Sequence, residues 1–84
     1  MSHVPHELHE EFPEAAEAIH ALKGANAHFA RLADEYHSVN RQIHRVETEI
    51  EPTSDEALEE LKKQRLYLKD EIAAMIATSR NVGA

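Results

Sequence analysis

Histidines are the first residues of this chain whose number and spacing suggest chemistry. The 84-residue sequence contains seven, and His3, His6 and His9 follow one another at intervals of three. A helix there would place the three imidazoles on one face, where they could bind Zn²⁺ or Ni²⁺. The chain also begins Met-Ser-His, and a free terminal amine with a third-position histidine can bind Cu²⁺ or Ni²⁺. Removal of Met1, which the small Ser2 favours, would destroy that second motif.

The remaining spacings favour ordinary surface histidines. His37 and His44 lie one heptad apart, about 10 Å along a helix, which is too far to share an ion. We therefore expect no metal site and no cofactor, and keep metal binding through the N-terminal histidines as an alternative function.

Catalytic groups are not arranged at catalytic spacing. The chain has no cysteine, Gly-rich phosphate loop, nucleophile elbow or H-E-x-x-H stretch. Its acidic pairs, Glu59–Glu60 and Asp70–Glu71, are typical of a solvated helix face. We expect no catalytic residues and no enzymatic activity.

Basic residues gather near the C-terminus, at Lys62, Lys63, Arg65 and Lys69, but acidic residues alternate with them. The formal net charge is −7, which opposes contact with nucleic acid or anionic lipid, because each phosphate needs a cation to replace its counterions. Weak association with nucleic acid is a second alternative function.

A long apolar seam must position all of these groups. Apolar residues recur every seventh position, and a second set follows three residues after each of the first four, which is the pattern of a coiled-coil helix that packs against a partner helix. The two sets are Leu22, Phe29, Tyr36, Ile43 and Ile50, and Ala25, Leu32, Val39 and Val46.

Prolines and capping residues set the expected helix ends. Pro13 suits a first helical position, and Pro52 stops a helix. Residues 53–56 read T-x-x-E, a capping box that begins the last helix. The expected helices cover about residues 13–23, 27–50 and 54–79.

Residues 23–26 have two interpretations. The helix either passes straight through, or Gly24 ends one helix and Asn26 caps the next. We favour the joint, and expect Gly24 to adopt a positive φ there.

A short connection at Pro52 makes the last two helices antiparallel neighbours, so the predicted fold is an all-α, coiled-coil-like helical hairpin with a short leading helix. This pairing sets Tyr36 near Ile72 and places Arg65 on the seam. We expect Glu47 to be the partner of Arg65, because a carboxylate can take a bidentate contact. The alternative is that the guanidinium extends to water.

Residues 12–80 form the expected single domain. Residues 1–11 form an acidic, His-rich leader that we expect to be mobile, and residues 81–84 a frayed tail. No stretch approaches the roughly 20 apolar residues that span a bilayer. Acidic residues near the N-terminus argue against a signal peptide.

Apolar residues that flank the seam predict self-association. Two helices bury one stripe each, which leaves Leu66 and Ile76 wet, and a hairpin of this size has a thin core. We expect a bundle of several copies and a further protein partner. The candidate seam and interface residues are Phe29, Tyr36, Glu47, Arg65, Leu66 and Ile76.

The sequence resembles the YdcH-like proteins of bacteria from Phe12 to Met75. The more specific part of the resemblance is Leu61-Lys62-Lys63-x-Arg65-Leu66-x-Leu68-Lys69-Asp70-Glu71-Ile72; the first half contributes Phe12-Pro13, Leu22-Lys23, His28-Phe29-x-x-Leu32, Glu35-Tyr36 and Ile43…Glu47. The resemblance implies a small cytoplasmic helical-hairpin protein whose biochemical role is not established, and it supplies no active site. We therefore expect a non-enzymatic protein-interaction module.

Overall fold

Helices make up the regular structure of the computed structural model, which describes residues 5–48 and 53–82. No strand occurs within these ranges, and this confirms the all-α class. The expectations for His3, Ile50, Pro52 and the last two residues of the tail lie outside them. The elements in chain order are α1 Leu8–Glu11, the 3₁₀ helix η1 Pro13–Ala15, α2 Ala16–Ala25, α3 Ala27–Glu47 and α4 Asp55–Val82.

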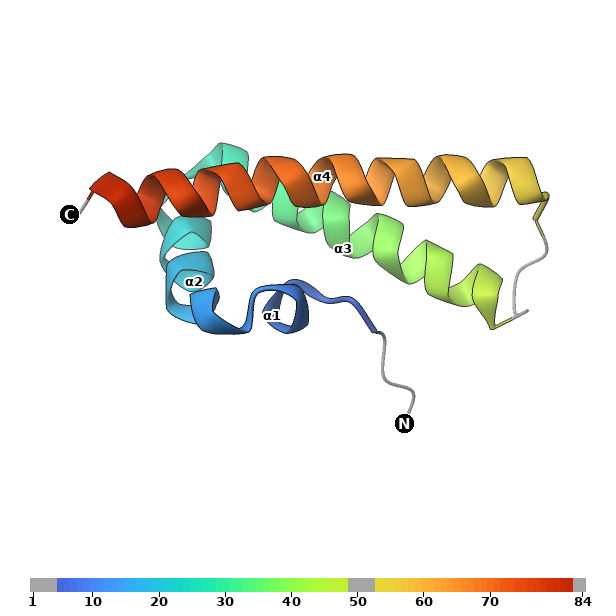
Figure 1. Ribbon diagram of the computed structural model, residues 1–84, viewed down its shortest axis with the longest axis horizontal. Helices are drawn as coiled ribbons and strands as arrows, with labels where there is room; N and C mark the ends of the chain where they lie inside the picture. Colours follow the sequence, from blue (N-terminus) through green and yellow to red (C-terminus); the bar gives the residue numbers. More distant parts are fainter. Residues whose placement is uncertain (1–4, 49–52, 83–84) are drawn as a thin grey trace.

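α3 and α4 lie side by side and run in opposite directions, while α2 packs against both of them at the end where the chain terminates (Figure 1). All five elements contribute to one hydrophobic core, because the short elements α1, η1 and α2 cover what the two long helices leave exposed. Its buried members are Leu8, Ala15, Ile19, Phe29, Leu32, Ala33, Tyr36, Leu68, Ile72 and Ile76.

The heptad seam of α3 is the buried face of that helix. Phe29 and Tyr36 are at most 1% exposed, and Leu32 is also buried, whereas Val39 and Val46 are half-buried. Helical spacing places these side chains on one stripe, and burying the stripe stabilises α3 more than helix propensity could.

The joint between α2 and α3 is a single residue, Asn26. Its backbone is extended, with φ −135° and ψ 108°, and its side-chain oxygen accepts a 3.0 Å hydrogen bond from the backbone N–H of Phe29. Asn26 is thus the N-cap of α3, as predicted. The expectation of a positive φ at Gly24 is wrong, because α2 runs through Gly24 with ordinary helical backbone and ends at Ala25.

The ends of the two long helices differ from the predicted ends. α3 stops at Glu47, where the Thr48 hydroxyl donates a 2.9 Å hydrogen bond back to the His44 carbonyl. Ser54, and not the predicted Thr53, caps α4: its Oγ accepts a 3.1 Å hydrogen bond from the Ala57 N–H. α4 extends to Val82, so residues 81–82 are helical where we expected a frayed tail.

Residues 5–11, which we call the N-terminal segment, differ most from the prediction. We expected a mobile leader, but the structure packs this segment against α3 and α4 and includes α1 in it (Figure 1). Leu8 is 8% exposed and belongs to the core. A four-residue helix leaves no periodic signal in a sequence, and tertiary contacts hold it in place.

No helix in the described ranges combines the length and the apolar character that crossing a bilayer requires.

Candidate functional site

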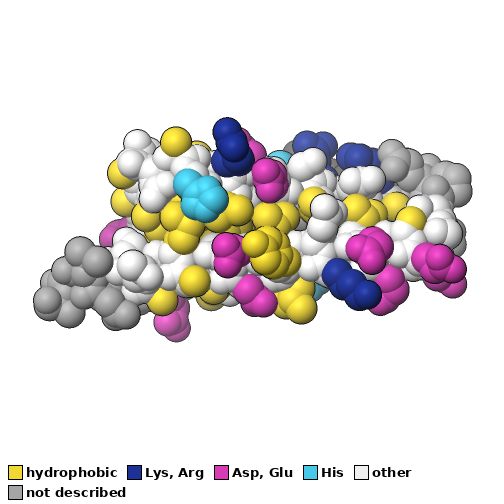
Figure 2. Space-filling view, turned by 90° about the horizontal axis from the view of Figure 1, so that it is seen from above, with side chains coloured by type: hydrophobic (Ala, Val, Ile, Leu, Met, Phe, Trp, Pro, Cys, Tyr) yellow, Lys and Arg dark blue, Asp and Glu magenta, His cyan; other side chains and the backbone are white. Residues whose placement is uncertain are grey.

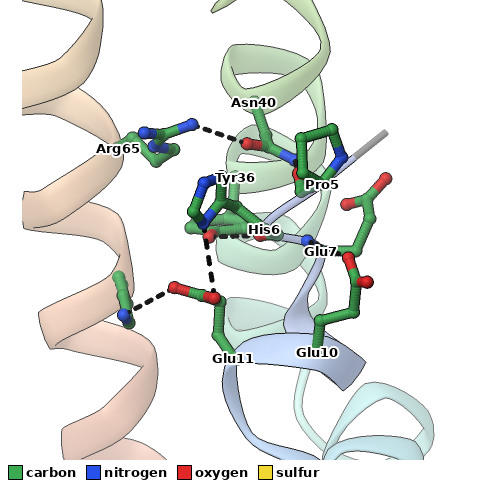
Figure 3. Close-up of polar contacts among 9 residues, drawn as sticks. Pro5, His6, Glu7, Glu10, Glu11, Tyr36, Asn40 and Arg65 are labelled. Carbon is green, nitrogen blue, oxygen red and sulfur yellow. Dashed lines mark hydrogen bonds and ion pairs between the residues drawn. The ribbon is translucent and has the colours of Figure 1, made fainter. Parts of the chain in front are cut away.

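A cluster of polar side chains lies where the N-terminal segment meets α3 and α4 (Figure 3). We call it the polar cluster. Its members come from three separate parts of the chain, and the two on α3 are buried in a core that is otherwise apolar. They are His6, Glu11, Tyr36, Asn40, Arg65 and Lys69.

Two side chains of α3 hold the backbone of the N-terminal segment. The Tyr36 hydroxyl donates a 2.6 Å hydrogen bond to the carbonyl of His6, and the Asn40 amide donates one of 2.8 Å to the carbonyl of Pro5. Tyr36 and Asn40 are four residues apart, so both point from the same face of α3. Both are 1% exposed, and a buried donor without an acceptor is costly, so these bonds fix the path of the segment.

His6 has an uncommon backbone conformation. Its φ is 65°, in the left-handed region that residues other than glycine rarely adopt. This turn is part of the path by which successive carbonyls, of Pro5 and His6, reach α3.

Arg65 contacts Asn40 and not the predicted Glu47. Its guanidinium donates a 2.9 Å hydrogen bond to the side-chain oxygen of Asn40. Glu47 is nearly half exposed and pairs with Lys62 at 3.3 Å. The buried Asn40 oxygen needs a donor, whereas a carboxylate near the surface can be satisfied by water or by a mobile lysine, so the amide takes the arginine.

An ion pair with Lys69 and contacts with two histidine rings hold the acidic side chains of the N-terminal segment. Glu11 lies 2.7 Å from the ammonium of Lys69 and 3.4 Å from the ring of His6, while Glu7 lies 2.9 Å from the ring of His37. The hydrogen bond from Lys69 holds the pKa of Glu11 below its ordinary value, against the opposing effect of burial. Glu11 therefore carries a negative charge at neutral pH, opposite the cations of α4.

Tyr36 is a hydrogen-bond donor at every physiological pH. Burial, followed by the nearby charge of Glu11, raises its pKa to about 12. The neutral hydroxyl keeps the proton that it donates to His6, which suits holding a segment in place.

The structure separates the predicted site residues into three groups. Phe29 and Tyr36 lie in the core. Ile76, predicted as part of a wet stripe, is 4% exposed, because the N-terminal elements cover it. Leu66 is the predicted site residue that stays exposed as a large hydrophobic side chain, at 60% exposure.

Sequence reasoning placed Asn40 one turn from the position opposite Arg65 but preferred Glu47, and it missed Tyr67. Asn40 sits beside the seam, and its burial depends on the N-terminal segment, which showed no pattern. Tyr67 is 64% exposed and belongs to neither heptad set. The sequence feature that could have identified Tyr67 is an aromatic residue directly after Leu66 and outside the seam.

The expected ligand groups do not gather in the part of the chain that the structure describes. His6 and His9 are exposed, and no three described His, Asp or Glu side chains lie together as a metal site requires. Two of the clustered basic residues, Lys62 and Lys69, pair with Glu47 and Glu11.

Comparison with known proteins gives one family. Residues 29–76, which run from the first turn of α3 into α4, match the model of the family described as "Protein of unknown function (DUF465)". No curated protein and no solved structure matches the chain.

Proposed function

Because the chain belongs to this family of unknown function, we propose its role from its surface: it is a non-enzymatic helical module that acts through protein contacts. In this proposal α3 and α4 form a helical hairpin that associates with further copies into a bundle and with another protein. The YdcH-like resemblance, with its cytoplasmic location, is part of the same proposal.

The exposure of Leu66 and Tyr67 carries this proposal. They are neighbours on α4, with 60% and 64% of their surfaces exposed, and are the exposed large hydrophobic residues of the described chain. Large apolar surfaces that stay wet in a small protein favour association, because covering them removes apolar area from water.

The two side chains lie on different sides of α4. Leu66 borders the polar cluster beside two of its members, Arg65 and Lys69. Tyr67 borders a groove between α3 and α4 that Val39 and Leu68 also line. Figure 2 shows a band of hydrophobic side chains that runs lengthwise between two ridges of the molecule, with acidic side chains beside it. A helix of a second copy could lie along such a groove, as in a helical bundle.

Light scattering tests this proposal through the molar mass in solution. The unmodified chain should have a mass above its monomer value of 9.5 kDa, and Tyr67→Glu and Leu66→Glu should each lower that mass. Gln42→Glu adds the same charge at an exposed position of α3 and should leave the mass unchanged. Equal masses for all four proteins would contradict association through this part of α4.

A further inference from the structure

We propose that the N-terminal segment is a built-in ligand, and that its site on α3 and α4 binds an acidic Leu-x-x-Glu segment of another protein when residues 5–11 leave it. This inference rests on the proposed role in protein contacts, but the contacts that carry it are made by Tyr36, Asn40 and Lys69 and not by Leu66 or Tyr67. We call the surface under the N-terminal segment the docking surface; it comprises Tyr36, His37, Asn40 and Lys69.

The docking surface recognises a backbone more than a particular sequence. Tyr36 and Asn40 donate to two successive carbonyls, at 2.6 and 2.8 Å, and a carbonyl is available from any residue. Arg65 fixes the Asn40 amide by donating to its oxygen, so the amide nitrogen is directed at the segment (Figure 3). Two ordered donors of this kind hold a chain that turns between the two carbonyls, as this segment does at His6 with φ 65°.

Side chains add a pattern to this backbone recognition. Leu8 enters the core and supplies the apolar anchor, and Glu11 reaches Lys69 at 2.7 Å. Glu7 adds a contact with His37 at 2.9 Å. The surface therefore fits a segment with a leucine followed three residues later by a glutamate, and with a further acid just before the leucine.

The contacts of the segment are suited to release. Its helix, α1, has only four residues and cannot persist without its contacts. The ring of His37 is 54% exposed and the Lys69 side chain 37% exposed, and exposed ion pairs contribute little. Leu8 is the single buried anchor of the segment.

The family match includes the docking surface but not the N-terminal segment. Residues 29–76 match, and this range contains every residue of the docking surface, whereas residues 5–11 lie outside it. If the segment leaves, water reaches the donors of Tyr36 and Asn40, and a new segment with backbone carbonyls can displace that water and accept from both. A second acidic segment supplies these carbonyls.

A labelled peptide with the sequence of residues 5–13 tests the proposal when it is titrated into full-length chains. Leu8→Asp weakens the internal segment, so this chain should bind the peptide at least about tenfold more tightly than the unmodified chain, where the tethered segment competes at high effective concentration. His9→Asp alters an exposed neighbour in the same segment and should behave like the unmodified chain.

Charge reversal makes the test specific. A peptide that carries Glu11→Lys should lose affinity for the Leu8→Asp chain and regain it when that chain also carries Lys69→Glu. Equal affinity of the peptide for the Leu8→Asp and unmodified chains, or no rescue by the double reversal, overturns the proposal. If Leu66→Glu and Tyr67→Glu do not lower the molar mass, the proposed self-association fails, but the peptide-binding result still stands because the peptide can bind a monomer.

Native-state hydrogen exchange provides a measurement that needs no variant. The amides of Glu10, Glu11 and Phe12 bond within the segment, to the carbonyls of Glu7 and Leu8. If the segment detaches on its own, these amides exchange at least about tenfold faster than those in the middle of α3. Protection equal to that of α3 would show that the segment opens only with the whole fold, and would overturn the proposal.

Discussion

Asn40 links three parts of the chain through a single amide. Its oxygen accepts from Arg65 on α4, its nitrogen donates to the Pro5 carbonyl, and its own backbone belongs to α3. At 1% exposure, neither end has access to bulk water. A buried amide with both ends satisfied favours one arrangement of its neighbours, because other arrangements leave a polar atom without a partner.

A double-mutant cycle tests the contact between Arg65 and Asn40. Arg65→Ala leaves the Asn40 oxygen without its donor, so we expect it to lower the free energy of unfolding by about 1–3 kcal/mol. Combined with Asn40→Ala, it should cost less than the sum of the two single changes. The control cycle pairs Arg65→Ala with Glu47→Ala and should be additive, since Glu47 contacts Lys62. Coupling to Glu47 in place of Asn40 would contradict the structure.

Alkaline pH tests the hydrogen bond of Tyr36. Its pKa is about 12 in the folded chain against an ordinary value of 10.0, so the unfolded chain loses this proton first. Tyr36 thus contributes stability that is fully present below pH 10 and is lost as the pH rises toward 12. Tyr36→Phe should lower the free energy of unfolding by about 0.5–1.5 kcal/mol at neutral pH.

Urea unfolding of both proteins at a series of pH values gives the measurement. The stability difference between the unmodified chain and Tyr36→Phe should shrink as the pH rises from 10 to 12. A difference that stays constant over this range would show that the hydroxyl ionises at its ordinary pKa in the folded chain.

At the scale of elements, helix boundaries depend on single side chains. Asn26 separates α2 from α3, Thr48 follows the last residue of α3, and Ser54 precedes α4. Asn26 and Ser54 each accept a hydrogen bond from a backbone N–H in the first turn of the following helix, and the Thr48 hydroxyl adds a second donor to the His44 carbonyl, which already accepts the Thr48 N–H. Short polar side chains can reach the backbone at a helix end. Their positions therefore decide where a helix begins or ends within the heptad pattern.

Gly24→Ala tests where the joint lies. Gly24 is helical, and among the described atoms outside its own helix none lies within 4 Å of the position of a Cβ. Alanine should therefore stabilise the fold by up to about 1 kcal/mol. Asn26→Ala is the matched change at the joint and should cost about 1 kcal/mol through loss of the cap. Destabilisation by Gly24→Ala would place the break at residue 24.

The all-α class and the buried face of α3 could be predicted from the sequence, because heptad spacing places apolar side chains on one face of a helix. The periodic spacing of Phe29 and Tyr36 gave the buried face of α3, and Asn26 gave its N-cap. The N-terminal segment could not be predicted. Its contacts are backbone carbonyls, one apolar anchor, Leu8, and the side chains of Glu7 and Glu11, and these do not produce a periodic pattern.

The partner of Arg65 shows why the candidate site was harder to predict than the helices. Asn40 and Glu47 both lie within one turn of the position opposite Arg65, and charge alone favours Glu47. Burial decides the choice, and burial of Asn40 depends on a segment from another part of the chain. A prediction that compares only pairs of side chains on two helices leaves out the N-terminal segment, which is the third element and which buries Asn40.

At the scale of the whole molecule, the core is completed by short elements while two large apolar side chains of α4, Leu66 and Tyr67, stay exposed. Phe12 and Ala15 come from the N-terminal elements and lie beside Ile76, while Leu8 and Ile19 belong to the same core. The expected interface at Ile76 is therefore internal, and the surface left for another molecule is at Leu66 and Tyr67. A domain this small gains substantially from further burial, because its own core supplies little surplus stability.

The concentration dependence of thermal unfolding tests self-association most directly, since it needs no variant and no partner. If copies associate in the folded state only, the melting temperature of the unmodified chain rises with protein concentration, as mass action requires. We predict such a rise, and predict that Tyr67→Glu reduces it. A melting temperature that is the same at low and high concentration, together with a mass of 9.5 kDa throughout, would contradict the proposal that this chain assembles with itself.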